Sequence, residues 1–307
     1  MSIRIASAPC CWGVEDPQNE YMPKWERVLD EASKAGYKGM ELGPYGYIPL
    51  DVEVVETALK SRGLTIIAGT LFDDLVSEEN LPVLLKKTED ICAFISKLPK
   101  AEAGPGQKFP APYLVIIDNI KPERSLLAGN PEKAPRLSEK DWKTMMNNIK
   151  QVSKVAWEKY QVRPVVHPHA GGYIEFADEI NKLLEDIPYE TAGLCLDSGH
   201  LYYSQMDPVT WFEEKYDRID FIHFKDIDQK VYESALEREI DFFQACAEKV
   251  MCPIGKGTVD YDSIHQLLKK LQYNGWITIE QERDPRNSDT SLQDVTESLD
   301  YLKNVGY

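Results

Sequence analysis

The sequence alternates short apolar runs with segments of helical spacing along its whole length. Eight apolar runs are expected to form strands, at residues 3–8, 39–43, 64–71, 111–117, 163–167, 192–197, 219–224 and 276–280. Helices are expected between and after them, at residues 25–35, 52–62, 80–98, 139–160, 175–185, 208–216, 261–271 and 291–303. Strands that alternate with helices predict a parallel sheet, and eight such repeats predict closure into a (β/α)8 TIM barrel.

The domain organisation is interpreted as one TIM-barrel domain over residues 1–307, because barrels of this length usually form a single domain. Two additions to a minimal barrel are expected. A long irregular βα loop lies near residues 118–137, and an extra helical insert lies near residues 230–250. Long βα loops are often functional, so the first is expected to be a lid, a partner surface or a plain insertion.

The charge and the apolar pattern exclude several classes of protein. The formal net charge is −16, and an acidic surface repels nucleic acid and anionic membranes, so neither is an expected partner. No apolar run approaches the roughly 20 residues of a membrane span. The first residues do not resemble a signal peptide, so a cytoplasmic protein is expected. The six cysteines form no C-x-x-C pair and are expected to be reduced.

Four of the predicted strands end in side chains that bind metal ions. His167, Asp197, His223 and Glu280 lie at the ends of the fifth to eighth strands. Strand ends converge at one face of a TIM barrel, so these residues are expected to hold one divalent ion, for which imidazole and carboxylate ligands are suited. Taken singly, each has a structural alternative: a helix cap for Asp197, a local hydrogen bond for His223 and a salt bridge for Glu280.

Other polar side chains lie close to these strand ends. His169 and His200 are expected to contact substrate oxygens, to transfer protons or to support a metal ligand. Lys225 is expected to bind a hydroxylated substrate or to pair with Asp226. His265 lies between polar neighbours in a helix and is expected at the surface.

A further set of residues is expected to contact the substrate. These residues are Glu41, Trp12, Lys256 and Glu282. Glu41 ends the second strand, with a buried ion pair or a cap as its alternative. Glycines on both sides of Lys256 would let its side chain reach inward. Trp12, with Tyr45 and Tyr47, is expected to form an apolar wall for a sugar ring or to pack on the barrel rim.

Several motifs together resemble the xylose isomerase-like barrels, which include sugar epimerases, inosose dehydratases and endonuclease IV. The matching segments are residues 35–43, 166–169, 196–200, 223–226, 253–257 and 275–282. The resemblance covers nearly the whole chain and is greatest to inosose dehydratases. It implies a metal site on Asp197, His223 and Glu280, with Mn²⁺ or Co²⁺ as the first expectation and Zn²⁺ or Fe²⁺ as alternatives.

One ligand position departs from the family pattern. The sugar epimerases carry a glutamate at the end of the fifth strand, where this chain has His167. Epimerases of this type use two opposed carboxylates, and here Glu280 has no carboxylate partner, so the resemblance favours a lyase. The implied reaction removes water from a cyclic polyhydroxy ketone. The implied base is Glu280 or a histidine of the 167/169 pair, and the implied acid is His200 or Lys225.

The resemblance leaves alternatives open. A sugar isomerase or 3-epimerase and a lyase acting on a 3-keto-glycoside are alternatives within the enzyme class. A metal-dependent nuclease is disfavoured by the five histidines and the acidic charge, and a non-catalytic sugar-binding barrel is disfavoured by the intact ligand set. The expected partner is a small keto-sugar or inosose. A homo-oligomer is also expected, because related barrels associate through their βα loops.

Overall fold

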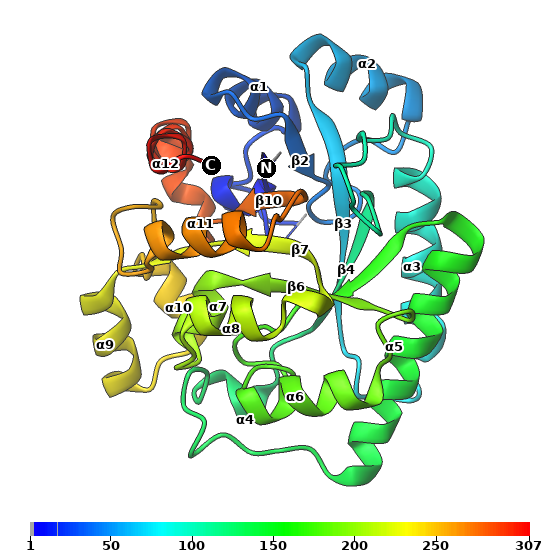
Figure 1. The fold of residues 1–307 in the computed structure, drawn as a ribbon, viewed down its shortest axis with the longest axis vertical. Coiled ribbons are helices and arrows are strands. Elements are labelled where there is room, and N and C mark those ends of the chain that lie inside the picture. The colour runs from blue at the N-terminus through cyan, green and yellow to red at the C-terminus, as the bar shows by residue number, and fades with distance from the viewer. Residues whose placement is uncertain (1–2, 17) are drawn as a thin grey trace.

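The structure is a computed structural model that describes residues 3–16 and 18–307. Its main sheet is built from β1 (Arg4–Ser7), β2 (Gly39–Glu41), β3 (Thr65–Asp73), β4 (Tyr113–Asp118), β5 (Arg163–Val166), β6 (Gly193–Asp197), β7 (Ile219–Phe224) and β10 (Trp276–Ile279). These strands close into a parallel barrel in the order β1-β10-β7-β6-β5-β4-β3-β2 (Figure 1). The predicted (β/α)8 fold is therefore confirmed.

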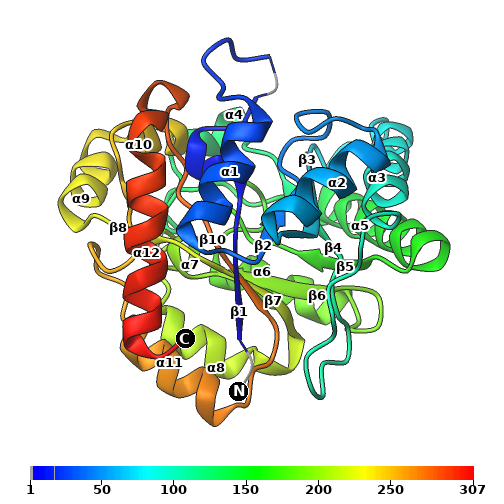
Figure 2. The same ribbon diagram turned by 90° about the horizontal axis from the view of Figure 1, so that it is seen from above.

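Helices surround this barrel, as the view from above shows (Figure 2). The α-helices are α1 (Trp25–Ala35), α2 (Val52–Arg62), α3 (Leu81–Ile95), α4 (Pro122–Ser125), α5 (Glu139–Tyr160), α6 (Ala177–Asp186), α7 (Ser198–Tyr203), α8 (Pro208–Glu214), α9 (Gln229–Arg238), α10 (Phe242–Ala247), α11 (Tyr261–Lys270) and α12 (Ser291–Val305). Short 3₁₀ helices occupy η1 (Pro9–Trp12), η2 (Tyr216–Arg218) and η3 (Pro285–Thr290). Among the described residues, no helix combines the length and apolar character needed to cross a bilayer.

Helix boundaries follow local capping chemistry. Helix α2 begins after Asp51, whose side chain accepts the backbone N–H groups of Glu53 and Val54, and such an acceptor satisfies the free donors of a first turn. Gly63 ends α2 at φ 64° and Gly36 ends α1 at φ 105°. Because a side chain is disfavoured at positive φ, glycine is the usual residue at these stops. The predicted ends of both helices are confirmed.

The two additions to the barrel are more ordered than the sequence indicated. The insert is not one helix over residues 232–249 but two helices, α9 and α10, flanked by the antiparallel strands β8 (Asp226–Ile227) and β9 (Met251–Cys252). The loop near residues 118–137 contains the short helix α4. Helix α7, directly after β6, was not predicted because its six residues are too short to show a helical period.

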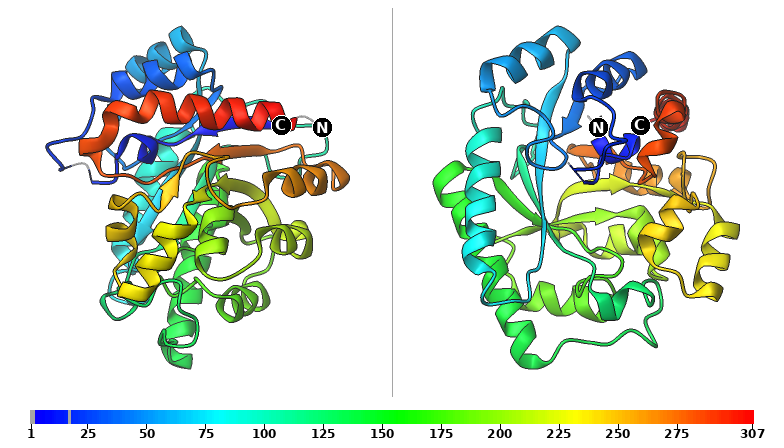
Figure 3. Two further views of the ribbon diagram at one scale, coloured as in Figure 1. Left: turned by 90° about the vertical axis from the view of Figure 1, so that its left-hand side faces the viewer. Right: turned by 180° about the vertical axis from the view of Figure 1, so that it is seen from behind.

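The strand register brings the chemical side chains to one end of the barrel. Asp197 of β6 is level with His223 of β7, and His223 is level with Thr278 of β10, two residues before Glu280. The described chain ends lie at the opposite end of the barrel from α9 and α10, which are yellow in Figure 3 (left). The candidate ligands therefore lie at the C-terminal face, where TIM barrels carry their active sites.

Candidate active site

Four side chains from neighbouring strands converge at the C-terminal face. One donor atom from each of His167, Asp197, His223 and Glu280 lies within 4.8 Å of the others. His167 Nε2 is 3.5 Å from Asp197 Oδ2, and His223 Nδ1 is 2.9 Å from Glu280 Oε2. Both ring nitrogens of His223 face carboxylates, since its Nε2 is also 2.8 Å from Glu41 Oε1, the buried ion pair that was the alternative for Glu41. Among the described residues, the ring nitrogens of His167 are buried without a hydrogen bond. Buried polar atoms normally have partners, so the nitrogens of His167 point to a missing ligand.

Burial and neighbouring charges set the protonation of these groups. Burial lowers the pKa of His167, so its imidazole is neutral and has a lone pair to offer. Burial also opposes the charged form of His223, but Cys195, Glu280 and Glu41 outweigh it and raise the pKa of His223 well above its usual value. Burial likewise opposes the charged form of Asp197, yet the cation of Lys225 keeps the pKa of that carboxyl well below its usual range.

Lys225 lies among the carboxylates of the site. Its Nζ is 2.5 Å from Asp197 Oδ2 and 3.1 Å from Glu282 Oε1, and it also contacts Glu280. Burial disfavours the charged amine, but these carboxylates raise the pKa of Lys225 well above its usual value. The side chain is therefore a fixed cation at the barrel mouth. Its predicted pairing with Asp226 does not occur, because Asp226 accepts backbone N–H groups of residues 255–259 instead.

The donor set fits a divalent metal ion. Two imidazoles and two carboxylates are the ligands expected for Mn²⁺, Co²⁺, Fe²⁺ or Zn²⁺. Buried uncompensated carboxylates are costly, and Lys225 supplies one positive charge against Asp197, Glu280 and Glu282. A second grouping, His167 with Cys195 and His223, is also compact. Burial raises the pKa of Cys195 to about 12, so its thiol is a much poorer ligand than the carboxylates.

A cavity of about 630 Å³ opens over these ligands. The predicted residues on its wall are Glu41, His167, His169, His223, Lys225, Glu280 and Glu282. Asp197 and His200 lie behind this wall and are 1% and 3% exposed. Burial raises the pKa of Glu282 to about 7, and one oxygen of this carboxylate is buried without a hydrogen-bond partner.

One backbone residue fixes the tautomers of two neighbouring histidines. His169 Nδ1 lies 2.9 Å from the carbonyl oxygen of Ala170, and the N–H of Ala170 donates to His200 Nδ1 at 3.2 Å. A carbonyl can only accept and an amide N–H can only donate. Nδ1 of His169 therefore carries the proton and its Nε2 is an acceptor, whereas the neutral His200 carries its proton on Nε2. Burial lowers the pKa of both rings, that of His169 to about 3.

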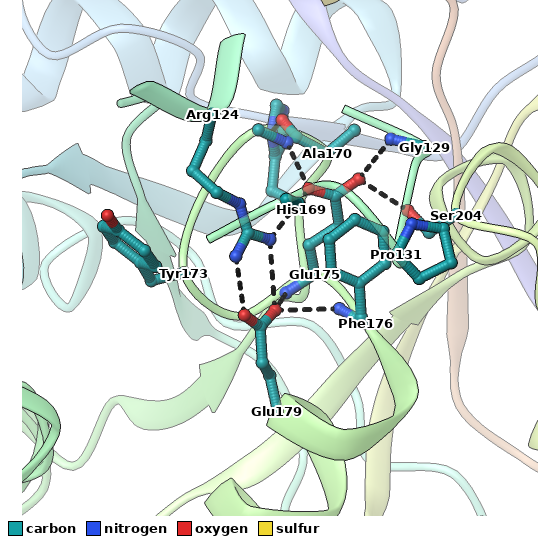
Figure 4. A network of polar contacts seen from close by, with 12 residues as sticks. Arg124, Gly129, Pro131, His169, Ala170, Tyr173, Glu175, Phe176, Glu179 and Ser204 are labelled. Atoms are coloured by element: carbon teal, nitrogen blue, oxygen red, sulfur yellow. Dashed lines mark hydrogen bonds and ion pairs between the residues drawn. The ribbon is translucent and has the colours of Figure 1, made fainter. Parts of the chain in front are cut away.

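A buried ion-pair network supports the loop after β5, which carries His169 (Figure 4). Arg124 pairs with Glu175 at 3.1 Å and with Glu179 at 2.6 Å, and its side chain is fully buried. Glu175 also accepts the N–H groups of Gly129 and Gly171 at 2.6 and 2.8 Å. One carboxylate thus connects the 118–137 loop to the loop after β5. The 118–137 loop is consequently held against the site.

The structure corrects three sequence-based predictions. Trp12 is fully buried away from the cavity wall, and its Nε1 donates to Glu31 at 2.6 Å. Lys256 is 62% exposed and lies 3.6 Å from Glu297, so it does not reach inward. The predicted surface residue His265 is 7% exposed and packs on the ring of Tyr307. Each correction depends on a tertiary neighbour that local spacing does not reveal.

The aromatic wall is also different from the prediction. Tyr45 lines the cavity, but Tyr47 instead donates its hydroxyl to the carbonyl oxygen of Pro23. Phe72 and Phe243 line the cavity and were not predicted. Phe72 was within reach of the strand-end rule, because β3 extends two residues beyond its predicted end. Phe243 lies in the insert, where the sequence carried no signal for it.

The fold and the site define a (β/α)8 barrel with a candidate metal centre at the C-terminal ends of its strands. The chain belongs to the xylose isomerase-like TIM barrel family, whose model matches residues 29–305.

Two kinds of similar protein accompany the family match. The inosose dehydratase of Salmonella agona is 24% identical over 286 residues, which cover 93% of this chain and 90% of that protein. Among solved structures, the probable 3-DHS dehydratase AsbF of Bacillus anthracis has a TM-score of 0.69 at 15% identity, covering 98% of this chain and 99% of AsbF. The IolI protein with a bound zinc atom has a TM-score of 0.71 at 13% identity, covering 98% and 97%. These structural likenesses show a shared fold.

Proposed function

We propose that the protein is a metal-dependent hydro-lyase that removes water from a neutral cyclic polyhydroxy ketone of the inosose type. The observation that carries this proposal is the convergence of two imidazoles and two carboxylates beside a cavity whose wall includes three of them, His167, His223 and Glu280. The relatives named inosose dehydratase, which match over most of both chains, support the choice of substrate class. A homo-oligomeric state and a cytoplasmic location stay predictions.

The metal would be held by His167, Asp197, His223 and Glu280, with Mn²⁺ or Co²⁺ as the first candidates. When bound, it would supply Lewis-acid polarisation of the substrate ketone and so acidify the neighbouring C–H bond. Glu280 is a poor choice as the base, because its carboxylate would be a metal ligand and already contacts His223. His200 is a poor choice as the acid, because it lies behind the cavity wall.

The remaining wall residues can perform the proton transfers of an elimination. We assign proton removal from the carbon next to the ketone to His169 or Glu282, each of which offers an acceptor atom at the wall. The released electron pair forms a C=C bond while the β C–O bond breaks, and the departing hydroxyl takes up the proton that His169 or Glu282 removed, so that it leaves as water and the base is restored. Lys225 faces the same cavity as a fixed cation and donates a hydrogen bond to an oxygen that gains negative charge.

The test is an assay of inososes with Mn²⁺, with Co²⁺ and after removal of metal by a chelator, following the absorbance of the unsaturated or diketone product. Asp197→Asn is expected to lose bound metal and at least about 100-fold in turnover. Asp289→Asn, a change at a carboxylate that is 95% exposed, is the matched control and is expected to be neutral. Full turnover without metal would contradict the proposal. Solvent deuterium in recovered sugar without dehydration would indicate an isomerase or 3-epimerase instead.

A further inference from the structure

The cavity above the candidate metal centre is larger than a bare cyclic polyol requires. Its volume of about 630 Å³ lies within the range of sites that enclose drug-sized ligands. The hydrogen-bonding and ionisable groups that would read a polyhydroxy ketone, such as His169, Lys225 and Glu282, are buried. Other parts of the wall are formed by apolar side chains. These would contact a substituent that extends beyond the ring of such a ketone.

Three exposed aromatic residues line this cavity. Tyr45, Phe72 and Phe243 are 37%, 41% and 42% exposed, and they come from the loop after β2, from β3 and from α10. They are three of the eight large hydrophobic side chains that are exposed among the described residues. Large apolar side chains gathered around one cavity are typical of a ligand site, whereas single exposed ones are ordinary surface.

The exposed aromatic residues adjoin the candidate active site. The ring of Phe72 lies 5.6 Å from that of His169, and the buried ring of Phe242 lies between, 5.3 Å from His169 and 5.8 Å from Phe243. These are ordinary packing distances for aromatic rings. A ligand that reaches His169 with one end can therefore contact Phe72 with a neighbouring group and extend toward Phe243.

The charges on the cavity wall disfavour an anionic extension such as a phosphate. The lysines on the wall are Lys87 and Lys225, and the imidazole of His223 is held by Glu41 and Glu280 at 2.8 and 2.9 Å. Lys87 already pairs with Asp73 at 2.5 Å, and Lys225 contacts three carboxylates. Acidic residues Glu15, Asp16 and Asp90 also line the cavity. An uncharged, flat apolar group fits this wall, because it can stack on the aromatic rings without losing the hydration of a charge.

We propose that Phe72, Phe243 and Tyr45 form a subsite for an aromatic substituent, and that the substrate is a neutral polyhydroxy ketone carrying such a group on its ring. The inference rests on the proposed function for the ring that lies over the metal ligands. The subsite contributes to binding and not to the reaction, so its effect on affinity can be measured with compounds that the protein cannot turn over.

The experiment compares two unreactive glycosides by isothermal titration calorimetry. Phenyl β-D-glucopyranoside and methyl β-D-glucopyranoside share a ring and differ in the substituent. The wild-type protein, loaded with Mn²⁺, is expected to bind the phenyl compound about 10-fold or more tightly than the methyl compound, since burial of an aromatic ring is worth that much. The double variant Phe72→Ala/Phe243→Ala is expected to reduce this ratio to about 3 or less.

Tyr21→Ala is the matched control, because Tyr21 is 57% exposed and does not line the cavity. It is expected to keep the wild-type ratio. Equal affinities for the two glycosides, a ratio that survives the double substitution, or no measurable binding of the phenyl compound would overturn the proposal. Light scattering measures the oligomeric state of the double variant. A changed oligomeric state with an unchanged ratio of the two affinities would assign the aromatic residues to a subunit interface, and this result would also overturn the proposal.

The outcome is separable from that of the proposed reaction. If the wild-type protein fails to dehydrate any inosose but shows a phenyl preference that depends on Phe72 and Phe243, the reaction is refuted and the subsite stands. If an inosose is dehydrated and both glycosides bind equally, the reaction stands and the subsite is refuted. Far-ultraviolet circular dichroism of the double variant checks that both measurements are made on folded protein.

Discussion

At the scale of single residues, the peptide group of Ala170 sets the tautomers of two histidines at the candidate active site. Its carbonyl accepts a hydrogen bond from His169 and its N–H donates one to His200, so the two adjacent imidazoles are opposite tautomers. The side chain of Ala170 plays no part in this arrangement. The position of the peptide depends instead on its neighbours, among them Gly171, whose N–H donates to the buried carboxylate of Glu175.

These tautomers can be observed directly. We expect long-range ¹H–¹⁵N correlation spectra of the histidine rings to show His169 protonated at Nδ1 and His200 protonated at Nε2 at neutral pH. Burial holds both rings neutral, because it lowers the pKa of each. A Phe72→Leu variant, which leaves the Ala170 peptide in place, should give the same two patterns. An Nε2–H pattern for His169 would show that its carbonyl contact is absent.

The buried ion pairs of Arg124 give a second prediction at this scale. Arg124→Met leaves Glu175 and Glu179 without their cation, which should lower the free energy of unfolding by about 3–5 kcal/mol at neutral pH. Urea titration followed by circular dichroism measures the loss. Arg238→Met is the matched control, since its pair with Glu248 lies at the surface and is screened by solvent, and it should leave the free energy of unfolding close to that of wild type.

The pH dependence of that loss has a defined sign. Burial already raises the pKa of Glu175 in the intact network, and removal of the cation should raise it further. A carboxyl with a raised folded-state pKa penalises the folded state above that pKa, and the penalty vanishes below the unfolded value of about 4.3. The stability difference between Arg124→Met and wild type should therefore shrink as the pH falls from neutral toward this unfolded-state value. A difference that stays constant over this range would contradict this explanation.

Prediction from sequence brought His167, Asp197, His223 and Glu280 together correctly, because parallel strands deliver their ends to one face of a barrel. Their role as metal ligands stays a prediction. Prediction from sequence failed for Trp12 and Lys256, whose environments depend on Glu31 and Glu297. Such contacts join residues of different elements, and the spacing of apolar residues within one element does not predict them.

At the scale of elements, the glycine motif at residues 255–257 has a structural explanation. Asp226 accepts the N–H groups of Gly255 and Gly257 at 2.9 and 3.0 Å, and that of Val259 at 3.0 Å. A Cβ added at Gly257 would lie 2.2 Å from the Asp226 carboxylate. The glycines therefore let the chain wrap closely around a buried carboxylate, and they do not serve to bring Lys256 inward.

Two substitutions separate these explanations. Gly257→Ala should destabilise the protein by about 1–3 kcal/mol, because the added methyl group has no space beside Asp226. Lys256→Ala should change stability by under about 0.5 kcal/mol and leave KM for the substrate unaltered, because that side chain is exposed. Thermal unfolding and steady-state kinetics measure both. A large rise in KM for Lys256→Ala would restore its predicted contact with substrate.

Elements with clear caps were the most predictable from sequence. The ends of α1 and α2 were located by Gly36 and Gly63, whose positive φ angles stop a helix. The division of the insert into α9 and α10 was missed. The residue at that break is Glu239 in the left-handed conformation, and a glutamate gives no sequence signal for a turn of this kind.

At the scale of the whole molecule, the candidate ligands join four adjacent strands, β5, β6, β7 and β10. An ion that binds the folded barrel and not the unfolded chain should raise its stability by about 2.7 kcal/mol at a concentration 100 times its Kd. Mn²⁺ or Co²⁺ should therefore raise the Tm of the chelator-treated protein, and Asp197→Asn should abolish that rise. A Tm that does not respond to either ion in the wild-type protein would count against the metal site.

The ammonium of Lys225 within the acidic cluster affects the stability of the barrel when no divalent ion is bound. In a site built from carboxylates alone, the carboxylates would repel one another after the metal ion dissociated. This repulsion would destabilise the packing of the four strands. Here the chain carries a permanent counterion of its own, anchored by the contacts with Asp197 and Glu282. If the site binds a divalent ion, as proposed, the barrel would stay folded without that ion and could bind it again when the ion is supplied.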